Sequence, residues 1–458
     1  MTDSELAENA VRLCQKRGAE QIGALLIHQE EKAAGVFDRQ VQISGMSETA
    51  RIILRVFRDH RGAVIQGNIS SEKVLEALVD QAFGILQHTS PDKYLGTAEL
   101  SEVGVIEGDL QIFDERLARL PLNRMEEIAL AAEQAVKQQD IRTEHLITTN
   151  LQVQTQTVTL RTSEGFSNSY QHTIATLVLN AVMEGYANAI AKPNSDPDKR
   201  DLIGTATAVT RSLDGLDLTK TAARAVQGLT SMTGARSSPA GEFPVLFSPL
   251  AARGIAAMLL QLCSGPATLL SEVATLGKIG ETICSPQLTL VDDATKKKGI
   301  GSSPFDHEGV RPSRKIIIEK GVLQDYLLNS YYGRALRRSS IGNAVANSDA
   351  RFGVRHSNAY IEAGASDPND LVADIKRGFL VTRFLSYSIP LSRGFTQAAA
   401  GFWIEDGKLD HPVRAAAIVA PLREMLKNVV AVGKDLDSDA PVASPTLLVS
   451  KMNVSPLL

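Results

Sequence analysis

The sequence predicts an α+β fold with two domains, residues 1–200 and 201–458. We expect helices on an antiparallel sheet in the first domain, and a strand-rich curved sheet or barrel in the second. Amphipathic helical stretches accompany strand-like runs in the first half, whereas short apolar runs separated by glycine turns dominate from Gln287 onward. Between them, Lys192–Arg200 is polar with two prolines, and it is either a linker or a loop within one domain.

The first half is predicted to begin with a helix and to continue with strands. Thr2 and Glu5 have capping-box spacing, and Gly18 is a natural helix stop. The periodicity then predicts a buried strand at Gln21–His28, a hairpin of Ala50–Phe57 and Gly62–Gly67, a helix from Ser71 and a helix at Met125–Gln138.

A second hairpin is predicted further along the first half. Residues in Leu151–Leu160 alternate as in a strand, and Ser163–Gly165 has the composition of a turn. The second arm is the β-rich run in Tyr170–Glu184. A hairpin of this length could curl a sheet over the helices.

The second half is expected to contain few helices. A helix is predicted near Thr219–Gln227, and Leu250–Cys263 is apolar nearly all round, which is typical of a buried helix. Short strands separated by glycine turns follow, and Leu422–Val429 could form one more short helix.

The composition is that of a soluble globular protein. The chain has 458 residues, 43% hydrophobic and 22% charged, and a formal net charge of −4. Cys14, Cys263 and Cys284 are too scattered for a disulfide framework, which favours a reducing compartment. There is no signal-peptide core, and the most apolar run, Gly254–Ser264, is shorter than the roughly 20 residues that span a bilayer. We therefore expect a cytoplasmic protein with no membrane segment.

The sequence carries no strong catalytic signature. HExxH, GxSxG, GxxxxGK[ST] and paired CxxC motifs are absent, and no histidine or cysteine pair has i, i+3 or i, i+4 spacing. Spacing thus predicts neither a catalytic residue nor a metal ligand, although distant residues could still assemble a site. The basic runs Lys296–Lys298 and Arg337–Arg338 lack an aromatic platform, so nucleic-acid binding is not expected.

Asp306 and Glu308 are candidate substrate-binding or interface residues. They lie two apart in the segment GSSPFDHEGVRPSR, so they would share one face of an extended chain, and Arg314 follows them. A carboxylate pair beside basic residues could bind a substrate terminus or act as an acid/base pair. The alternative, which we favour, is a bend before Gly309 in which the carboxylates pair with nearby arginines.

Asn343, Phe402 and Trp403 are further candidates for substrate or interface contacts. Asn343 lies between Gly342 and Ala344, where turn geometry is the default over a phosphate loop. Phe402 and Trp403 lie in an alternating strand, and Trp403 is either a buried anchor or part of a substrate-contacting edge.

Five stretches of the chain, in order, resemble the TldD/PmbA family of peptidase-related proteins. SEGFSNSY at Ser163–Tyr170 is similar to the family's Asn-Gly-Phe hairpin. The other four are Ser302–Leu328, Gly342–Gly364, Gly394–Val413 and Leu426–Val454. Each motif alone is weak, but five in the same order are specific, and the resemblance spans most of the chain.

The resemblance also implies which branch of the family this is. TldD-type members carry a HExxxH helix and a C-terminal cysteine as zinc ligands, whereas PmbA/TldE-type members lack them. The corresponding helix here, in Phe247–Gly265, has neither His nor Glu, and no cysteine follows Cys284. The resemblance therefore implies a PmbA/TldE-type subunit with no metal site or cofactor of its own.

Such a subunit is expected to join a TldD-like zinc peptidase subunit, which supplies zinc and hydrolysis. The complex would act on unfolded or modified peptides, and the isolated chain could form a homodimer. Two other functions stay open. The family is also called modulator of DNA gyrase, which implies a regulatory or binding protein of gyrase or a toxin–antitoxin system. An independent hydrolase using Asp306, His307 and Glu308 ranks last.

Overall fold

The computed structural model has a mixed α+β architecture. It describes residues 2–69, 71–139, 146–182, 203–230, 234–269, 277–385, 394–437 and 440–457. Helices lie on an antiparallel sheet in the first half, and the second half is strand-rich with a small barrel, as predicted. The stretch Lys192–Arg200, predicted as a linker or loop, lies outside the described residues.

Six strands form the first sheet, in the order β3-β2-β1-β4-β5-β6, and all neighbours are antiparallel. Their bounds are β1 Gln21–Phe37, β2 Gln40–Arg58, β3 Arg61–Asn68, β4 Leu146–Thr162, β5 Ser167–Val182 and β6 Ile203–Thr210. The two predicted hairpins are confirmed as β2–β3 and β4–β5. β1 and β2 extend beyond the predicted strands to a tight turn at Asp38 and Arg39, whose φ values are both positive.

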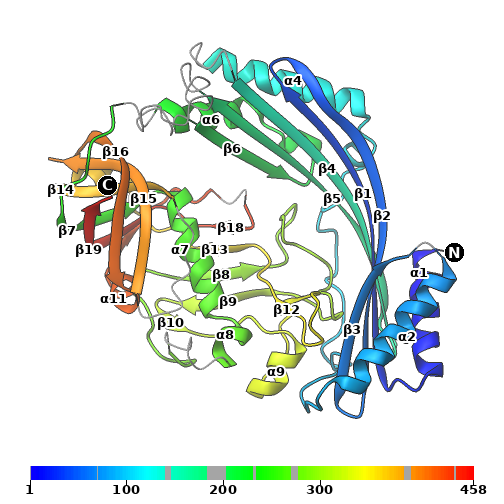
Figure 1. The fold of residues 1–458 in the computed structure, drawn as a ribbon. Helices are drawn as coiled ribbons and strands as arrows, with labels where there is room; N and C mark the ends of the chain where they lie inside the picture. The colour runs from blue at the N-terminus through cyan, green and yellow to red at the C-terminus, as the bar shows by residue number, and fades with distance from the viewer. Residues whose placement is uncertain are drawn as a thin grey trace.

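Helices cover the convex face of this sheet (Figure 1). They are α1 Asp3–Lys16, α2 Glu72–His88, α3 Glu115–Ala118, α4 Leu122–Gln139 and α6 Leu218–Thr230, with a 3₁₀ turn at Leu213–Gly215. The Thr2–Glu5 capping box at the start of α1 is present. The side chains of β1 alternate between the two faces of the sheet. Ile22, Ala24 and Leu26 lie on the convex face, where they pack against α1 and α2.

The second half contains a five-stranded sheet in the order β10-β9-β8-β13-β18 and a separate hairpin, β11–β12. The sheet strands are β8 Leu290–Asp293, β9 Arg314–Glu319, β10 Val322–Leu323, β13 Ala359–Ile361 and β18 Val442–Ala443; the hairpin strands are β11 Ala344–Val345 and β12 Gly353–Val354. Short helices connect these elements: α8 Gly265–Leu269, α9 Ser330–Leu336 and α10 Pro368–Ala373. They were absent from the sequence-based prediction, because helices of five to seven residues leave little periodicity to detect.

The barrel is formed by β16-β15-β14-β7-β19 and is closed by pairing of β16 with β19. The bounds are β7 Gly241–Phe247, β14 Arg377–Phe384, β15 Gly394–Glu405, β16 Lys408–Pro421 and β19 Leu447–Pro456, with β17 Val429–Val432 alongside β19. β7 and β14 run parallel and the other neighbours run antiparallel.

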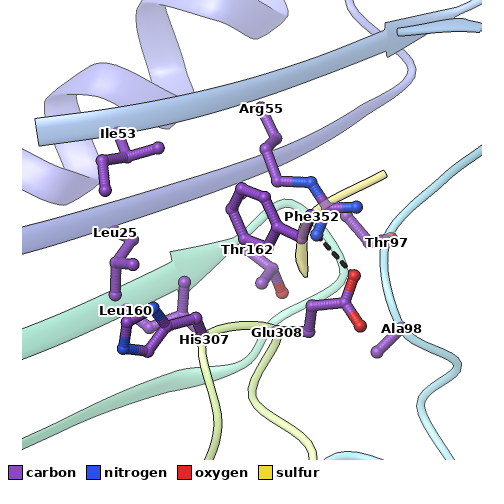
Figure 2. Close-up of a pocket in the computed structure, with 11 residues that line it drawn as sticks. Leu25, Ile53, Arg55, Thr97, Ala98, Leu160, Thr162, His307, Glu308 and Phe352 are labelled. Atoms are coloured by element: carbon purple, nitrogen blue, oxygen red, sulfur yellow. Dashed lines mark hydrogen bonds and ion pairs between the residues drawn. The ribbon is translucent and has the colours of Figure 1, made fainter. Parts of the chain in front are cut away.

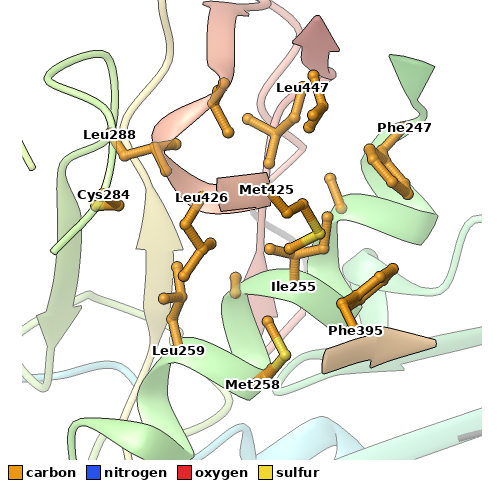
Figure 3. Packing of buried hydrophobic residues seen from close by; sticks show 14 of the residues in the cluster. Phe247, Ile255, Met258, Leu259, Cys284, Leu288, Phe395, Met425, Leu426 and Leu447 are labelled. Atoms are coloured by element: carbon orange, nitrogen blue, oxygen red, sulfur yellow. The ribbon is translucent and has the colours of Figure 1, made fainter. Parts of the chain in front are cut away.

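Helix α7, Pro249–Leu262, is the predicted buried helix, and it lies between the barrel and the five-stranded sheet (Figure 1). Its side chains Ile255, Met258 and Leu259 belong to one apolar core with Phe395 of the barrel and Leu426 of α11, Leu422–Lys427 (Figure 3). Burying each large apolar side chain contributes about 1.5–3 kcal/mol, so this core fixes α7 firmly.

The concave face of the first sheet meets the second half. Leu25, Ile53 and Leu160 of the sheet pack against Phe305 and Phe352. Both β6 and α6 come after the predicted domain boundary at residue 200. In the structure β6 pairs with β5, and α6 packs on the first sheet, so the structural unit built on that sheet extends to α6. None of the helices in the described part of the chain has the length and apolarity needed to cross a membrane.

Candidate functional site

The segment that carries Asp306 and Glu308 is a tight, buried turn. Oδ1 of Asp306 accepts hydrogen bonds from the backbone N–H groups of Glu308 and Val310, each at 2.9 Å. Gly309 allows the bend because its φ is +85°. Oδ2 of Asp306 accepts from the N–H of Ala344 at 2.8 Å, which ties the turn to the β11–β12 hairpin. The predicted bend is therefore present, and it turns Asp306 toward backbone amides.

Glu308 forms a buried ion pair with Arg55 of β2. The atoms Oε1 and Nη1 are 2.7 Å apart, and the two residues are 3% and 4% exposed. The other carboxylate oxygen accepts from the N–H of Ser330 at 2.8 Å. Arg55 also donates to the carbonyl of Ala350 at 3.0 Å, and its guanidinium lies over the ring of Phe352. The pair thus joins the first sheet to three segments of the second half.

A small cavity adjoins this ion pair, as Figure 2 shows. Its volume is about 10 Å³, which is close to the least space that holds one water molecule. It is too small for any substrate side chain. Arg55 and Thr97 line it, and Nε of Arg55 and Oγ1 of Thr97 are buried with no hydrogen-bond partner among the described residues. This junction therefore has a structural role rather than an open catalytic one.

Burial and the neighbouring Glu308 carboxylate raise the pKa of Asp306 to about 7, although the hydrogen bonds from three backbone amides act to lower it. Burial, with the positive charges of Arg355 and Arg51, lowers the pKa of His307 to about 3. Both carboxylates are occupied by protein partners and His307 is kept neutral. The structure thus gives no support to a hydrolase built from these three residues.

The remaining predicted residues lie in three different places. The amide of Asn343 is buried beside the turn and donates to Asp292 at 3.1 Å and to the Arg355 carbonyl at 2.7 Å. Arg314 is exposed on β9 and pairs with Glu362 at 3.2 Å. Phe402 and Trp403 lie on β15 in the barrel, where the Trp403 ring is buried against Phe243. Only Asp306, Glu308 and Asn343 are brought together.

Buried Arg211 and His172 were not found by sequence reasoning. Arg211, just after β6, donates to Nδ1 of His172 at 2.7 Å and to the carbonyls of Gly299 and Thr173, each at 3.3 Å. It also contacts the carbonyls of Ile300 and Ser302. No carboxylate pairs with it among the described residues. Burial, with lesser contributions from Arg211, Arg355 and His307, lowers the pKa of His172 to about 3.

Because the fold lowers the pKa of His172, we expect the protein to lose stability at acid pH. The unfolded chain binds a proton near the ordinary pKa of 6.5, while the folded chain does not until about 3, so stability is present above 6.5 and is lost as the pH falls. We expect a loss of about 2 kcal/mol from this group between about pH 7.5 and about pH 4.5. Urea unfolding of wild type and His172→Gln at both pH values measures it, because Gln can still accept from Arg211. Equal losses in both proteins would contradict the prediction.

Among the described residues, no group of three His, Cys, Asp or Glu side chains is placed so that it could hold a metal ion. Cys263 and Cys284 are buried in the apolar core around α7, and burial raises the pKa of both thiols, that of Cys284 to about 12. Metal binding requires thiolates, which this environment disfavours.

Family models and known proteins match most of the chain. Residues 115–232 match the family model of the PmbA/TldA metallopeptidase central domain, and residues 240–456 match that of the C-terminal domain. The chain is 27% identical over 410 residues to metalloprotease PmbA of Escherichia coli O157:H7, covering 88% of this chain and 85% of that protein.

Solved structures share the whole fold. A proposed modulator of DNA gyrase from Bacteroides thetaiotaomicron superposes with a TM-score of 0.87 at 21% identity, covering 100% of both chains. TldE from Thermococcus kodakarensis superposes with a TM-score of 0.82 at 20% identity, covering 98% of this chain and 100% of that one. At such identities the likeness concerns the fold.

Proposed function

We propose, from the premise that this chain belongs to the PmbA/TldD metallopeptidase family, that it is a zinc-free subunit of a peptidase complex. A TldD-like partner would supply the zinc and the hydrolytic step. The complex would act on unfolded or modified peptides in the cytoplasm. Three buried cysteines, none of them in a disulfide, agree with a reducing compartment.

The observation that carries this proposal is the composition of α7. Ala, Ile, Met and Leu stand where the family resemblance places the ligands and the general base of a zinc peptidase. Ala251, Ala252, Ile255 and Ala256 are buried in apolar surroundings. A zinc-bound water needs His or carboxylate ligands and an acid/base group beside it, and α7 offers neither.

The chain's own contribution would be to hold the peptide. Three glutamines on the concave face of the first sheet are half-buried and hydrogen-bonded to one another or to Glu31. They are Gln29, Gln154 and Gln156. Because amide side chains both donate and accept, such a row can bind the main chain of an extended peptide without regard to its side chains.

Mixing the purified chain with a TldD-like partner tests the proposal. We expect cleavage of a labelled peptide by the mixture at least about tenfold faster than by either protein alone, with the rate abolished by a chelator. The partner alone is the control for its residual activity. Peptide cleavage by the isolated chain that survives chelation would contradict the proposal.

A further inference from the structure

We propose that the concave face of the first sheet carries a binding site for a carboxylate, formed by Arg51 and Arg355 around His307. The inference rests on the proposed function in that the carboxylate would belong to a peptide, either its C-terminus or an acidic side chain. No sequence motif marks this site, because its residues come from β2, the turn before Gly309 and the end of the β11–β12 hairpin.

The strand register places these residues on one face. Arg51 of β2 is paired with Ile27, which is paired with Val158, which is paired with Tyr170 of β5. Residues paired in this way point to the same side of a sheet. Ile27, Val158 and Tyr170 belong to the apolar cluster beneath the second half, so Arg51 faces the second half as well.

The other residues of the set are linked to the β11–β12 hairpin and its end. Nδ1 of His307 accepts from the N–H of Ala346 at 3.0 Å, and the N–H of Arg355 donates to the Asn343 carbonyl at 2.9 Å. Besides burial, the positive charges of Arg355 and Arg51 both act to lower the pKa of His307, and that of Arg355 also acts to lower the pKa values of His172 and Tyr170. Cations from both halves of the molecule are therefore close enough to His307 to act on it.

The polar groups of this set that remain available to a ligand are hydrogen-bond donors. Because Nδ1 of His307 is an acceptor, the proton of the neutral ring lies on Nε2. The same holds for His172, whose Nδ1 accepts from Arg211. Guanidinium groups only donate. A site of donors with two fixed positive charges recognises an anion, and the planar guanidinium fits a carboxylate in particular.

The charges of Arg51 and Arg355 are not neutralised within the described chain. Both residues are exposed, and neither guanidinium has an ion pair or hydrogen bond there. The nearby carboxylates are already engaged: Asp306 by three amides, Glu308 by Arg55, and Glu31 by Gln29 and Gln154. An incoming carboxylate would thus meet two uncompensated cations.

Calorimetric titration of the isolated chain tests the site. The probe is an N-acetylated hexapeptide of Gly, Ser and Ala with a free C-terminal carboxylate, compared with its C-terminal amide and with the amide carrying one internal Glu. We expect the free acid to bind at least about tenfold more tightly than the amide, because only its carboxylate can form charge-assisted hydrogen bonds with the arginines. Restored affinity of the Glu peptide would show that a side-chain carboxylate is also accepted.

The variant Arg51→Gln/Arg355→Gln should lose the preference for the free acid. Arg119→Gln, which removes an exposed arginine paired with Glu115 on α3, is the matched control and should bind as wild type. Thermal unfolding checks that the double variant is folded, as expected for side chains without partners. Equal binding of acid and amide by wild type, no binding of the acid, wild-type binding by the double variant, or equally strong displacement by inorganic phosphate would each overturn the proposal.

This titration uses no partner subunit, whereas the proposed function is tested by cleavage in the mixture. If the isolated chain prefers the free-acid peptide but the mixture does not cleave peptides, the carboxylate site is supported and the subunit role is refuted. Cleavage that shows no dependence on Arg51 and Arg355, with equal binding of acid and amide, would refute the site alone.

Discussion

Replacing Glu308 with Ala is expected to destabilise the protein by about 3–5 kcal/mol, because it leaves the Arg55 guanidinium buried without its counter-ion. The same change removes the acceptor of the Ser330 N–H. The loss would be measured as the free energy of unfolding in urea. If the variant does not fold, Glu308→Gln, which keeps hydrogen-bonding capacity without the charge, should show a smaller loss.

A double-mutant cycle separates the ion pair from other effects. The double variant Arg55→Ala/Glu308→Ala should lose at least about 2 kcal/mol less than the sum of its single variants, since removing both partners leaves no unpaired charge. Glu362→Ala is the control. Its partner Arg314 is exposed, so the change should cost about 1 kcal/mol or less. Additive losses in the cycle would show that the pair is not coupled as described.

Replacing Gly401 with Ala is expected to disrupt the barrel, at a cost of about 3–5 kcal/mol. A Cβ at this position would lie 1.8 Å from the carbonyl oxygen of Leu380 and 3.0 Å from the Cα of Val381. These are backbone atoms of β14, so no side-chain rotation relieves the overlap, and the β14–β15 pairing must open. Thermal unfolding and urea unfolding measure the change.

Gly394→Ala, in the same strand, is the matched control. A Cβ there meets nothing within 4 Å, so the change should alter stability by about 0.5 kcal/mol or less. Similar losses for the two variants would indicate that glycine flexibility, rather than the approach of β14, decides the effect.

Local signals in the sequence predicted much of the first half. The Thr2–Glu5 capping box and the turn at Ser163–Gly165 depend on neighbouring residues, so they can be recognised without tertiary information. The continuation of β1 to Phe37 could not be recognised, because Glu31, Lys32 and the alanines that follow have low strand propensity. Pairing with β2 and β4 holds them in the sheet.

The candidate site was predicted only in part. The bend at Asp306 and the glycine that closes it depend only on neighbouring residues, so the turn could be predicted from the sequence. Its ion-pair partner Arg55 lies 253 residues earlier in the chain, and nothing in the sequence connects the two. Arg51 and Arg355 become neighbours of His307 only through the sheet register and the packing of the two halves.

Zinc analysis of the purified protein distinguishes a zinc-free subunit from a peptidase with a metal site of its own. The chain would be purified alone and after co-expression with a TldD-like partner, and bound zinc would be measured per mole of protein. We expect substoichiometric zinc in the isolated chain, because α7 offers no ligand and the thiols are buried, and stoichiometric zinc in the complex. One zinc ion bound per isolated chain would contradict the proposal of a zinc-free subunit.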